Sequence, residues 1–349
     1  MTDPILVAGA DLEAFATAAF AAAGVAPDLA RPWAEVLVWA NLRGTDSHGV
    51  IRIPRYLELL KRNAINPAPA MRIVRRSGAV AVLEGDRAPG GPAMIRAMDE
   101  AIALSREVHI GWCAVRNITH AGAIGYYALR AAAAGMAGIV MTAAGPLMAY
   151  HGARVSGVST NPLAIAVPAG RRRPFLLDMS TSTVSNGRIL AAKERGDAVP
   201  SGWGLDAAGR DTTDARAIAT LTPLGGPKGS GLSAMIECLA SLAAGNPLIA
   251  AALAGGAVAG GPTFNGVAIA ADLAAFGDPA AFRDEVDRLG DALAGLPRAD
   301  GVERILLPGE RGDAVRAERE RTGIPIPAAT WARLAASAAA VGVTPPGTS

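Results

Sequence analysis

Residues 79–142 read AVAVLEGDRA PGGPAMIRAM DEAIALSREV HIGWCAVRNI THAGAIGYYA LRAAAAGMAG IVMT and alternate short apolar runs with longer, helix-forming segments. Three runs rich in Ala, Val and Ile, bounded by Gly, Pro or Asn, are typical of strands; they span 79–83, 111–117 and 138–142. The segments between them, 93–108 and 123–135, have the length and composition of helices. This alternation predicts an α/β fold in which helices cover a sheet.

Upstream of this region the pattern is helical. Apolar residues spaced for one face, between Asp11 as a cap and Gly24 as a stop, predict a helix over 11–24. Further helices are expected over 27–43 and 57–61. Downstream, we expect strands over 162–168, 175–178, 267–272 and 302–307, and helices over 229–244, 314–322 and 328–340. Residues 200–214 are rich in Gly, Asp and Thr and are expected to form a surface excursion.

The composition excludes several classes of protein. With 51% hydrophobic and 18% charged residues in 349, the chain is too apolar to be disordered. Its net charge of +2, from 33 basic and 31 acidic side chains, gives no electrostatic reason to expect a nucleic-acid partner. Cys113 and Cys238 do not have the spacing of a disulfide framework or a zinc site, so we expect two buried thiols in a reducing cytoplasm.

The most apolar stretches, 131–150 and 236–261, are rich in Ala and Gly and are interrupted by Pro146 and Pro247. A membrane-spanning helix needs about 20 consecutive apolar residues, so we interpret both stretches as buried helix–strand segments and expect no membrane partner. The amino-terminal residues lack the positive charge of a signal peptide.

Common catalytic signatures are absent from the sequence. There is no glycine-rich dinucleotide fingerprint after a strand, no phosphate-binding P-loop, no nucleophile elbow and no His-Glu-x-x-His zinc motif. The chain has four widely spaced histidines, so we predict no metal site.

The segment 43–56, RGTDSHGVIRIPRY, concentrates chemically versatile side chains between two expected helices. His48 can give or take a proton near neutral pH, and the adjacent Ser47 can orient it. Arg52 offers a planar fork that grips a carboxylate through two hydrogen bonds. These residues suit a small anionic substrate whose oxygen gains or loses a proton. An ordinary capped helix junction, with Asp46 or Ser47 as the cap, explains the same pattern equally well.

Two further segments place small residues where a helix begins. Residues 117–127 run from the end of a strand through His120 and Gly122 into a helix, and 225–232 place Lys228 among glycines. The free N–H groups of such helix starts can bind phosphate. An ordinary strand–turn–helix and a flexible turn with a solvated lysine are the alternatives. Residues 306–312 follow an expected strand and could form another backbone cradle.

Taken together and in this order, these motifs resemble the malate/L-lactate dehydrogenase family of the non-Rossmann type, which includes sulfolactate, ureidoglycolate and diketogulonate enzymes and cyclic imine reductases. The resemblance covers about residues 12–327. The stretches 160–165 and 177–182 also match. It implies an oxidoreductase that uses NAD or NADP and forms a homodimer. It also implies a mixed-sheet cofactor domain over 74–305 and a helical domain built from 1–73 and 306–349.

The resemblance assigns roles residue by residue. His48 matches the proton donor and Ser47 its relay partner, and in some branches the histidine matching His120 is the proton acceptor. The implied substrate contacts are Arg52, Tyr56, Thr160, Asn186, Gly187 and Arg188. The implied cofactor contacts are His120, Ala121, Gly122, Ala123, Ile124, Asp178, Met179, Ser180, Lys228, Leu307, Pro308, Gly309, Glu310 and Arg311.

The expected reaction is hydride transfer between NAD(P)H and C2 of a small 2-oxo or 2-hydroxy acid. In the reducing direction a protonated His48 would neutralise the charge that grows on oxygen, while Arg52 fixes the carboxylate. Arg188 stands where many 2-hydroxy-acid members have Lys and imine reductases have Asp, and it favours the acid branch. The alternatives are a reductase of pyrroline- or piperideine-2-carboxylate and a catalytically silent nucleotide-binding scaffold.

Overall fold

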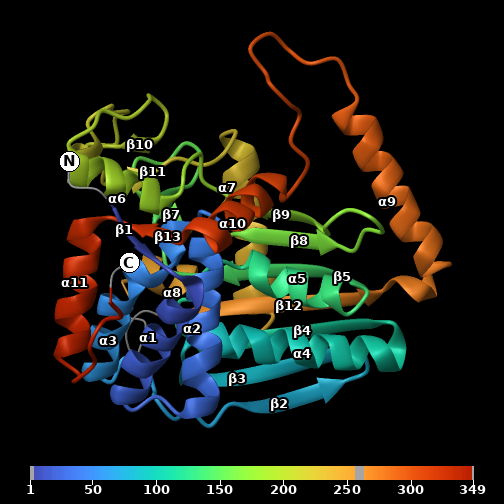
Figure 1. Ribbon diagram of the computed structural model, residues 1–349, viewed down its shortest axis with the longest axis horizontal. Helices are drawn as coiled ribbons and strands as arrows, with labels where there is room; N and C mark the ends of the chain where they lie inside the picture. The colour runs from blue at the N-terminus through green and yellow to red at the C-terminus, as the bar shows by residue number, and fades with distance from the viewer. Residues whose placement is uncertain (1–3, 256–262, 348–349) are drawn as a thin grey trace.

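The computed structural model describes residues 4–255 and 263–347. Helices from both ends of the chain pack into one helical domain (Figure 1). Its helices are α1 (Gly9–Ala22), α2 (Pro27–Leu42), α3 (Ile53–Lys61) and α11 (Ala328–Ala339). Strand β1 (Ile5–Val7) pairs antiparallel with β13 (Ile324–Ile326), which joins the two ends directly. The expected helical domain from both termini is therefore confirmed, whereas its boundaries at 73/74 and 305/306 stay a prediction.

The second domain is built on a seven-stranded sheet in the order β2-β3-β4-β12-β5-β8-β9. Its strands are β2 (Arg72–Ser77), β3 (Val80–Ala88), β4 (Ile110–Ile118), β5 (Met136–Ala143), β8 (Leu163–Val167), β9 (Phe175–Met179) and β12 (Phe264–Asp272). Only the β3–β4 pair of this sheet is parallel, and the other neighbours run antiparallel. The mixed, non-Rossmann sheet that the family resemblance implied is therefore confirmed.

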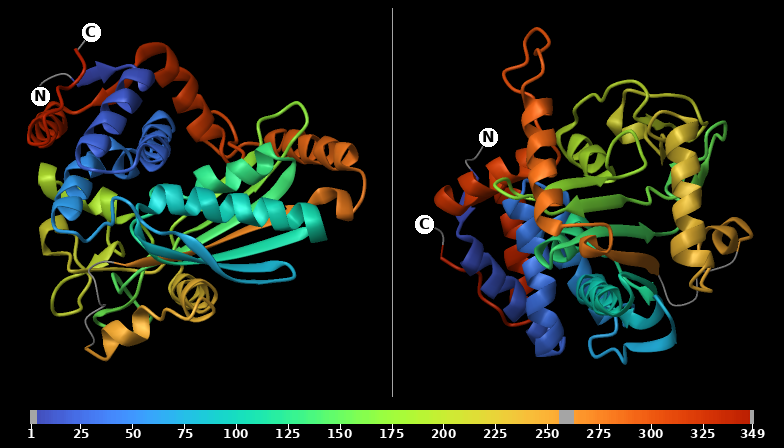
Figure 2. Two further views of the ribbon diagram at one scale, coloured as in Figure 1. Left: turned by 90° about the horizontal axis from the view of Figure 1, so that it is seen from below. Right: turned by 90° about the vertical axis from the view of Figure 1, so that its right-hand side faces the viewer.

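Apolar residues alternate between the two faces of this sheet, as successive residues of a strand must. Cys113 and Val115 of β4 contribute to the core under α4 (Gly90–Val108) and α5 (Gly125–Ala133). Their neighbour Ala114 contributes to the opposite core, against α7 (Pro227–Glu237) and its π-helical continuation η4 (Cys238–Leu242). Figure 2 shows α4 and α5 on one face and α7 on the other.

A smaller layer lies beside the main sheet, around a separate apolar cluster. It contains α6 (Asn186–Arg195) and a four-stranded sheet of β6 (Met148–Ala149), β7 (Ser156–Val158), β10 (Gly204–Leu205) and β11 (Thr220–Leu221). Short turns of 3₁₀ helix are η1 (Asp46–His48), η2 (Val50–Arg52), η3 (Ala215–Ala217) and η5 (Leu273–Ala275), and α8 is Ile249–Leu253. The expected surface excursion over 200–214 belongs to this layer.

Helix α9 (Pro279–Ala294) projects at the periphery, and the chain returns from it through a long loop to α10 (Glu310–Thr322) (Figure 1). The expected strand over 302–307 is wrong, because this segment lies in the returning loop and has no strand partner there. Instead, Val302 and Leu306 are exposed. Several further elements were not predicted: the strands β1, β2, β6, β7, β10, β11 and β13 and the helices α6, α8 and α9.

Cys113 is buried as expected, but Cys238 is exposed, because it lies on the outer side of the π-helical turn. Within the described part of the chain, no helix is long and apolar enough to span a membrane. Residues 256–261 of the second apolar stretch lie outside the described residues.

Candidate active site

Two histidines from separate parts of the chain face each other between the helical domain and the sheet. His48 ends η1, and His120 follows β4. Their rings lie 5.4 Å apart, centroid to centroid, at an angle of 25°. The Phe264 ring lies nearly perpendicular to that of His120, with the ring centroids 5.5 Å apart. Each histidine is largely enclosed by protein but keeps part of its surface exposed, so a ligand can reach it.

The turn that carries His48 is held by its neighbours. Ser47 Oγ lies 3.0 Å from His48 Nδ1, and Arg52 Nε donates to the Ser47 carbonyl oxygen at 2.7 Å. Asp46, the residue before Ser47, accepts two hydrogen bonds from Arg319 of α10, at 2.6 and 3.1 Å. Asn41 Nδ2 donates to the same carboxylate at 2.6 Å. Asp46 thus fastens the turn to α2 and α10.

The hydrogen bonds of His120 determine its tautomer. The Gly122 N–H, which can only donate, points to His120 Nδ1 at 3.2 Å. Nδ1 must therefore be the unprotonated nitrogen, and the Tyr56 hydroxyl, 2.8 Å away, also donates to it. The proton of the neutral His120 ring is consequently on Nε2.

Burial and charge keep both histidines neutral. Burial, reinforced by the positive charge of Arg52, lowers the pKa of His48 to about 4. The same two causes, with a further contribution from His48, hold the pKa of His120 well below its ordinary value. A protonated His48, as expected for the reducing direction, therefore needs a partner that offsets Arg52.

The guanidinium group of Arg52 is available to bind a carboxylate that would offset its positive charge. Its Nε is used by Ser47, but no carboxylate of residues 4–255 or 263–347 pairs with its guanidinium group. Arg52 is partly exposed beside the two histidines. A substrate carboxylate bound there would neutralise the charge that depresses the pKa of His48.

Tyr56 does not have the exposure expected of a substrate contact. Its side chain is 2% exposed and packs on Trp33, with ring centroids 4.8 Å apart. Its hydroxyl reaches His120 from the side of the helical domain. Burial raises the pKa of Tyr56 to about 12, against the opposing effect of Arg52, so the hydroxyl stays protonated and can donate.

The other expected substrate residues lie on the smaller layer or next to it. Gly187, at the start of α6, is packed so closely on Ser47 that an added Cβ would lie 2.3 Å from the Ser47 Cβ. Asn186 precedes it and is partly exposed. Arg188 is exposed and lies over the Trp203 ring, 5.6 Å from its centroid. The Thr160 carbonyl accepts from the Thr181 N–H at 3.2 Å.

Strand β9 brings the expected cofactor segments together. Asp178 of β9 accepts from the Gly125 N–H at 2.8 Å, directly after the segment 120–124. The Leu176 N–H donates to the Pro308 carbonyl at 3.1 Å. After Met179 and Ser180, the Thr181 carbonyl accepts from the Leu224 N–H at 2.9 Å, which ties on the turn that contains Lys228.

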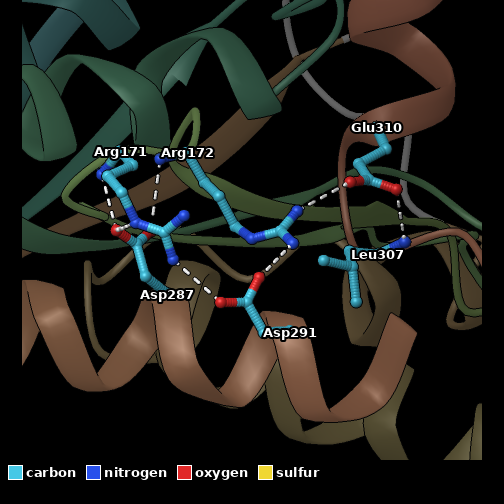
Figure 3. Close-up of polar contacts among 6 residues, drawn as sticks. All are labelled: Arg171, Arg172, Asp287, Asp291, Leu307 and Glu310. Atoms are coloured by element: carbon cyan, nitrogen blue, oxygen red, sulfur yellow. Dashed lines mark hydrogen bonds and ion pairs between the residues drawn. The ribbon is translucent and has the colours of Figure 1, made fainter. Parts of the chain in front are cut away.

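These segments fit a nucleotide cofactor. Gly309 has φ +94° and lies against the Leu176 backbone. Only glycine readily adopts this backbone conformation, which shapes the 307–311 turn. Glu310 shapes that turn by accepting from the Leu307 N–H at 3.0 Å (Figure 3). Lys228 is exposed in the first turn of α7. A lysine at a helix start can bind phosphate as a point charge, whereas the Gly229 and Ser230 N–H groups already donate to the carbonyl oxygens of Leu224 and Gly226. Among the described residues there is no metal-ligand cluster.

Sequence reasoning missed the residues that support the turn of His48. Arg319 lies 273 positions from Asp46, and it carries no local motif. Phe264, which borders His120, comes from β12 and was likewise not identified. A single sequence carries no signal for a pairing between residues so far apart along the chain. The turn that carries His48 was recognisable from its composition.

Comparisons with known proteins identify the family of this chain. The profile of the malate/L-lactate dehydrogenase family matches residues 7–335. L-sulfolactate dehydrogenase of Methanocaldococcus jannaschii is 38% identical over 290 residues, covering 82% of this chain and 83% of that protein. Malate dehydrogenase of Pyrococcus horikoshii is 33% identical over 313 residues, 87% of this chain and 86% of that protein.

Solved structures show the same architecture. Malate dehydrogenase from Entamoeba histolytica superposes with a TM-score of 0.92 at 26% identity, over 99% of this chain and 100% of that one. Δ1-piperideine-2-carboxylate reductase from Pseudomonas syringae gives a TM-score of 0.84 at 28% identity, over 95% and 99% of the two chains. The chain therefore belongs to the malate/L-lactate dehydrogenase family. It is an oxidoreductase.

Proposed function

We propose that this enzyme interconverts a small 2-oxo acid and its 2-hydroxy acid with a nicotinamide cofactor. The observation that carries the proposal is one cluster of two neutral histidines with an arginine that lacks a carboxylate partner among the described residues. The family of 2-hydroxy-acid dehydrogenases supports the same reaction class. When bound, the nicotinamide supplies or accepts the hydride at C2.

Arg52 binds the carboxylate of the substrate and sets the position of C2. The guanidinium fork matches two carboxylate oxygens, and its Nε–Ser47 contact restricts its rotation. Holding the reacting carbon in one orientation removes much of the entropic barrier of the reaction. The bound carboxylate also screens Arg52 from His48.

His48 transfers the proton, and His120 holds the reacting oxygen. In the oxidising direction the neutral His48 accepts the proton of the 2-hydroxyl group, and Ser47 on its Nδ1 leaves Nε2 for the substrate. In the reducing direction the protonated His48 returns that proton. His120, with its proton on Nε2, donates a hydrogen bond to the same oxygen and stabilises its growing charge.

A cyclic imine carboxylate is the second candidate substrate. The structural similarity to Δ1-piperideine-2-carboxylate reductase favours it, because such a substrate also carries the carboxylate that Arg52 would bind. It needs an acid next to the imine nitrogen. Arg188, at the position where we expect an aspartate in that branch, supplies none, so the oxo-acid assignment is preferred. The relatives named above are enzymes, which gives the silent scaffold no support.

The proposal includes a homodimer that works in a reducing cytoplasm. Exposed leucines on α9 and the loop after it, Leu289, Leu293 and Leu296, are the kind of apolar surface that a partner copy covers. The unpaired thiols Cys113 and Cys238 suit a reducing compartment. Analytical ultracentrifugation should give twice the mass of one chain, and a monomer at micromolar concentration would contradict the assembly.

Turnover of reduced cofactor with a panel of acids tests the function. The panel holds pyruvate, oxaloacetate, sulfopyruvate and diketogulonate, with pyrroline- and piperideine-2-carboxylate as the imine arm. We expect turnover with a 2-oxo acid and a roughly 10²- to 10⁴-fold loss in His48→Ala, with cofactor binding retained. Turnover with the imines alone would select the second candidate, and neither turnover nor cofactor binding would reject both.

A further inference from the structure

A cavity of about 290 Å³ opens at the start of β9, between the returning loop and α10. Its lining is formed by Arg172, Arg173, Pro174, Phe175, Arg304, Pro308, Glu310, Asp313 and Ala314. The opposite end of β9 carries Asp178 and Met179, and a five-residue strand spans about 13 Å. The cavity is thus one strand length from Asp178 and Met179 of the proposed cofactor site, and it shares Pro308 and Glu310 with that site.

The carboxylates of this cavity are already paired. Figure 3 shows Arg172 between Asp291 of α9, at 2.6 Å, and Glu310, at 3.4 Å. The second Glu310 oxygen accepts from the Leu307 N–H. Asp313, on the far wall, pairs with Arg43. Each lining carboxylate therefore already pairs with an arginine of this chain.

Two lining arginines are in the opposite situation. Arg173 and Arg304 are exposed, and neither pairs with a carboxylate of residues 4–255 or 263–347. The neighbouring Arg172 is fixed by its two partners, and it passes over Gly290 of α9, where a Cβ would lie 3.0 Å from its Nε. The cavity therefore has two arginines without a carboxylate partner among the described residues, beside the fixed Arg172. The apolar Pro174 and Phe175 lie next to them.

We propose that this cavity takes the adenosine 2′-phosphate of NADP(H), so that the enzyme prefers NADP(H) to NAD(H). The inference rests on the proposed function. A ribose 2′-hydroxyl is usually recognised by an acidic side chain, whereas a 2′-phosphate is recognised by arginine. A phosphate monoester carries a charge of about −1.5 to −2 and matches the guanidinium fork of Arg173 and Arg304.

Cofactor binding, measured without any substrate, tests the inference. The fluorescence of NADPH and of NADH is titrated with the wild-type protein and with Arg173→Gln/Arg304→Gln. Arg75→Gln is the control for the loss of one positive charge. Arg75 is exposed on β2, at the opposite edge of the sheet from the cavity. Competition by 2′,5′-ADP and by 5′-ADP isolates the phosphate from the nicotinamide.

We expect the wild-type protein to bind NADPH at least 10-fold more tightly than NADH, and 2′,5′-ADP to compete better than 5′-ADP. The double variant should lose roughly 10- to 100-fold in affinity for NADPH and less than about 2-fold for NADH. Equal binding of the two cofactors, or an equal loss for both in the variant, would overturn the inference and leave the proposed function intact. Binding of neither cofactor would count against the proposed function itself.

Discussion

The Tyr56 hydroxyl donates to His120 Nδ1 across 2.8 Å, from a buried position within the helical domain. Tyr56, from the amino-terminal helices, thereby fixes the tautomer of His120, which follows a strand of the central sheet. The Gly122 N–H reinforces the same tautomer. The two domains thus meet at the proposed reaction centre, and Tyr56 positions His120 without being exposed to substrate.

Tyr56→Phe tests this positioning role. The ring keeps its packing on Trp33, so we expect the fold to stay intact, whereas kcat should fall about 5- to 10-fold, as for one hydrogen bond worth roughly 1 kcal/mol. The Nδ1 chemical shift of His120 should change because that nitrogen loses one of its two donors, while the Gly122 N–H keeps the proton on Nε2. Unchanged shifts together with unchanged kcat would remove Tyr56 from the site.

Gly187→Ala tests the contact between α6 and the turn of His48. The new Cβ would lie 2.3 Å from the Ser47 Cβ, so one of the two segments must move. We expect kcat/KM to fall about 10- to 100-fold, because small displacements of catalytic groups are costly. Gly277→Ala is the control, since its Cβ would meet no atom of the described residues within 4 Å. Equal, small effects of the two substitutions would show that Ser47 tolerates displacement.

Arg319→Lys tests the support of Asp46 by α10. Lysine keeps the charge but cannot make the paired hydrogen bonds at 2.6 and 3.1 Å, so we expect kcat/KM to fall about 10-fold and Tm to decrease. The matched control is Arg316→Lys on the same helix, whose partner Glu320 is a helical neighbour in solvent. A loss of Tm with unchanged kcat/KM would mean that the pair stabilises the fold alone.

The pH dependence of the reaction follows from the lowered pKa of His48. The base form needed for oxidation is already complete well above a pKa of about 4, so kcat/KM for the hydroxy acid should be flat in this group between about pH 6 and 8. The acid form needed for reduction falls about tenfold per pH unit over the same range, and so should kcat/KM for the oxo acid. A bend near pH 6.5 that His48→Gln abolishes would show that the pKa is not lowered.

Local patterns in the sequence were sufficient for most of the fold. The run over 111–117 lies in β4. Its apolar residues pack into the cores on both faces of the sheet, as expected of a central, buried strand. The segment 302–307 is also rich in aliphatic residues, but no strand among the described residues pairs with it, so it forms a loop. Helix α9 was missed because its buried face holds Val286, Asp287 and Gly290, and only the first is a large apolar residue.

The candidate site was predictable in its parts but not in its connections. His48, His120 and Arg52 were identified from residue chemistry, and the structure brings them together. The direction of the Tyr56 hydroxyl and the partnership of Asp46 with Arg319 depend on how the helices pack, and no local spacing encodes them. The cavity beside Arg172 likewise arises from the approach of α9 and α10 to β9.

The most direct test of the central claim is the transfer of a deuterium label. Reduced cofactor deuterated at the transferable C4 position is incubated with the enzyme and the accepted 2-oxo acid, and the product is analysed by mass spectrometry and proton NMR. Direct hydride transfer predicts one deuterium on C2 of the hydroxy acid, formed roughly 10²- to 10⁴-fold more slowly by His48→Ala. A product without deuterium at C2, or an equal rate in the variant, would contradict the account.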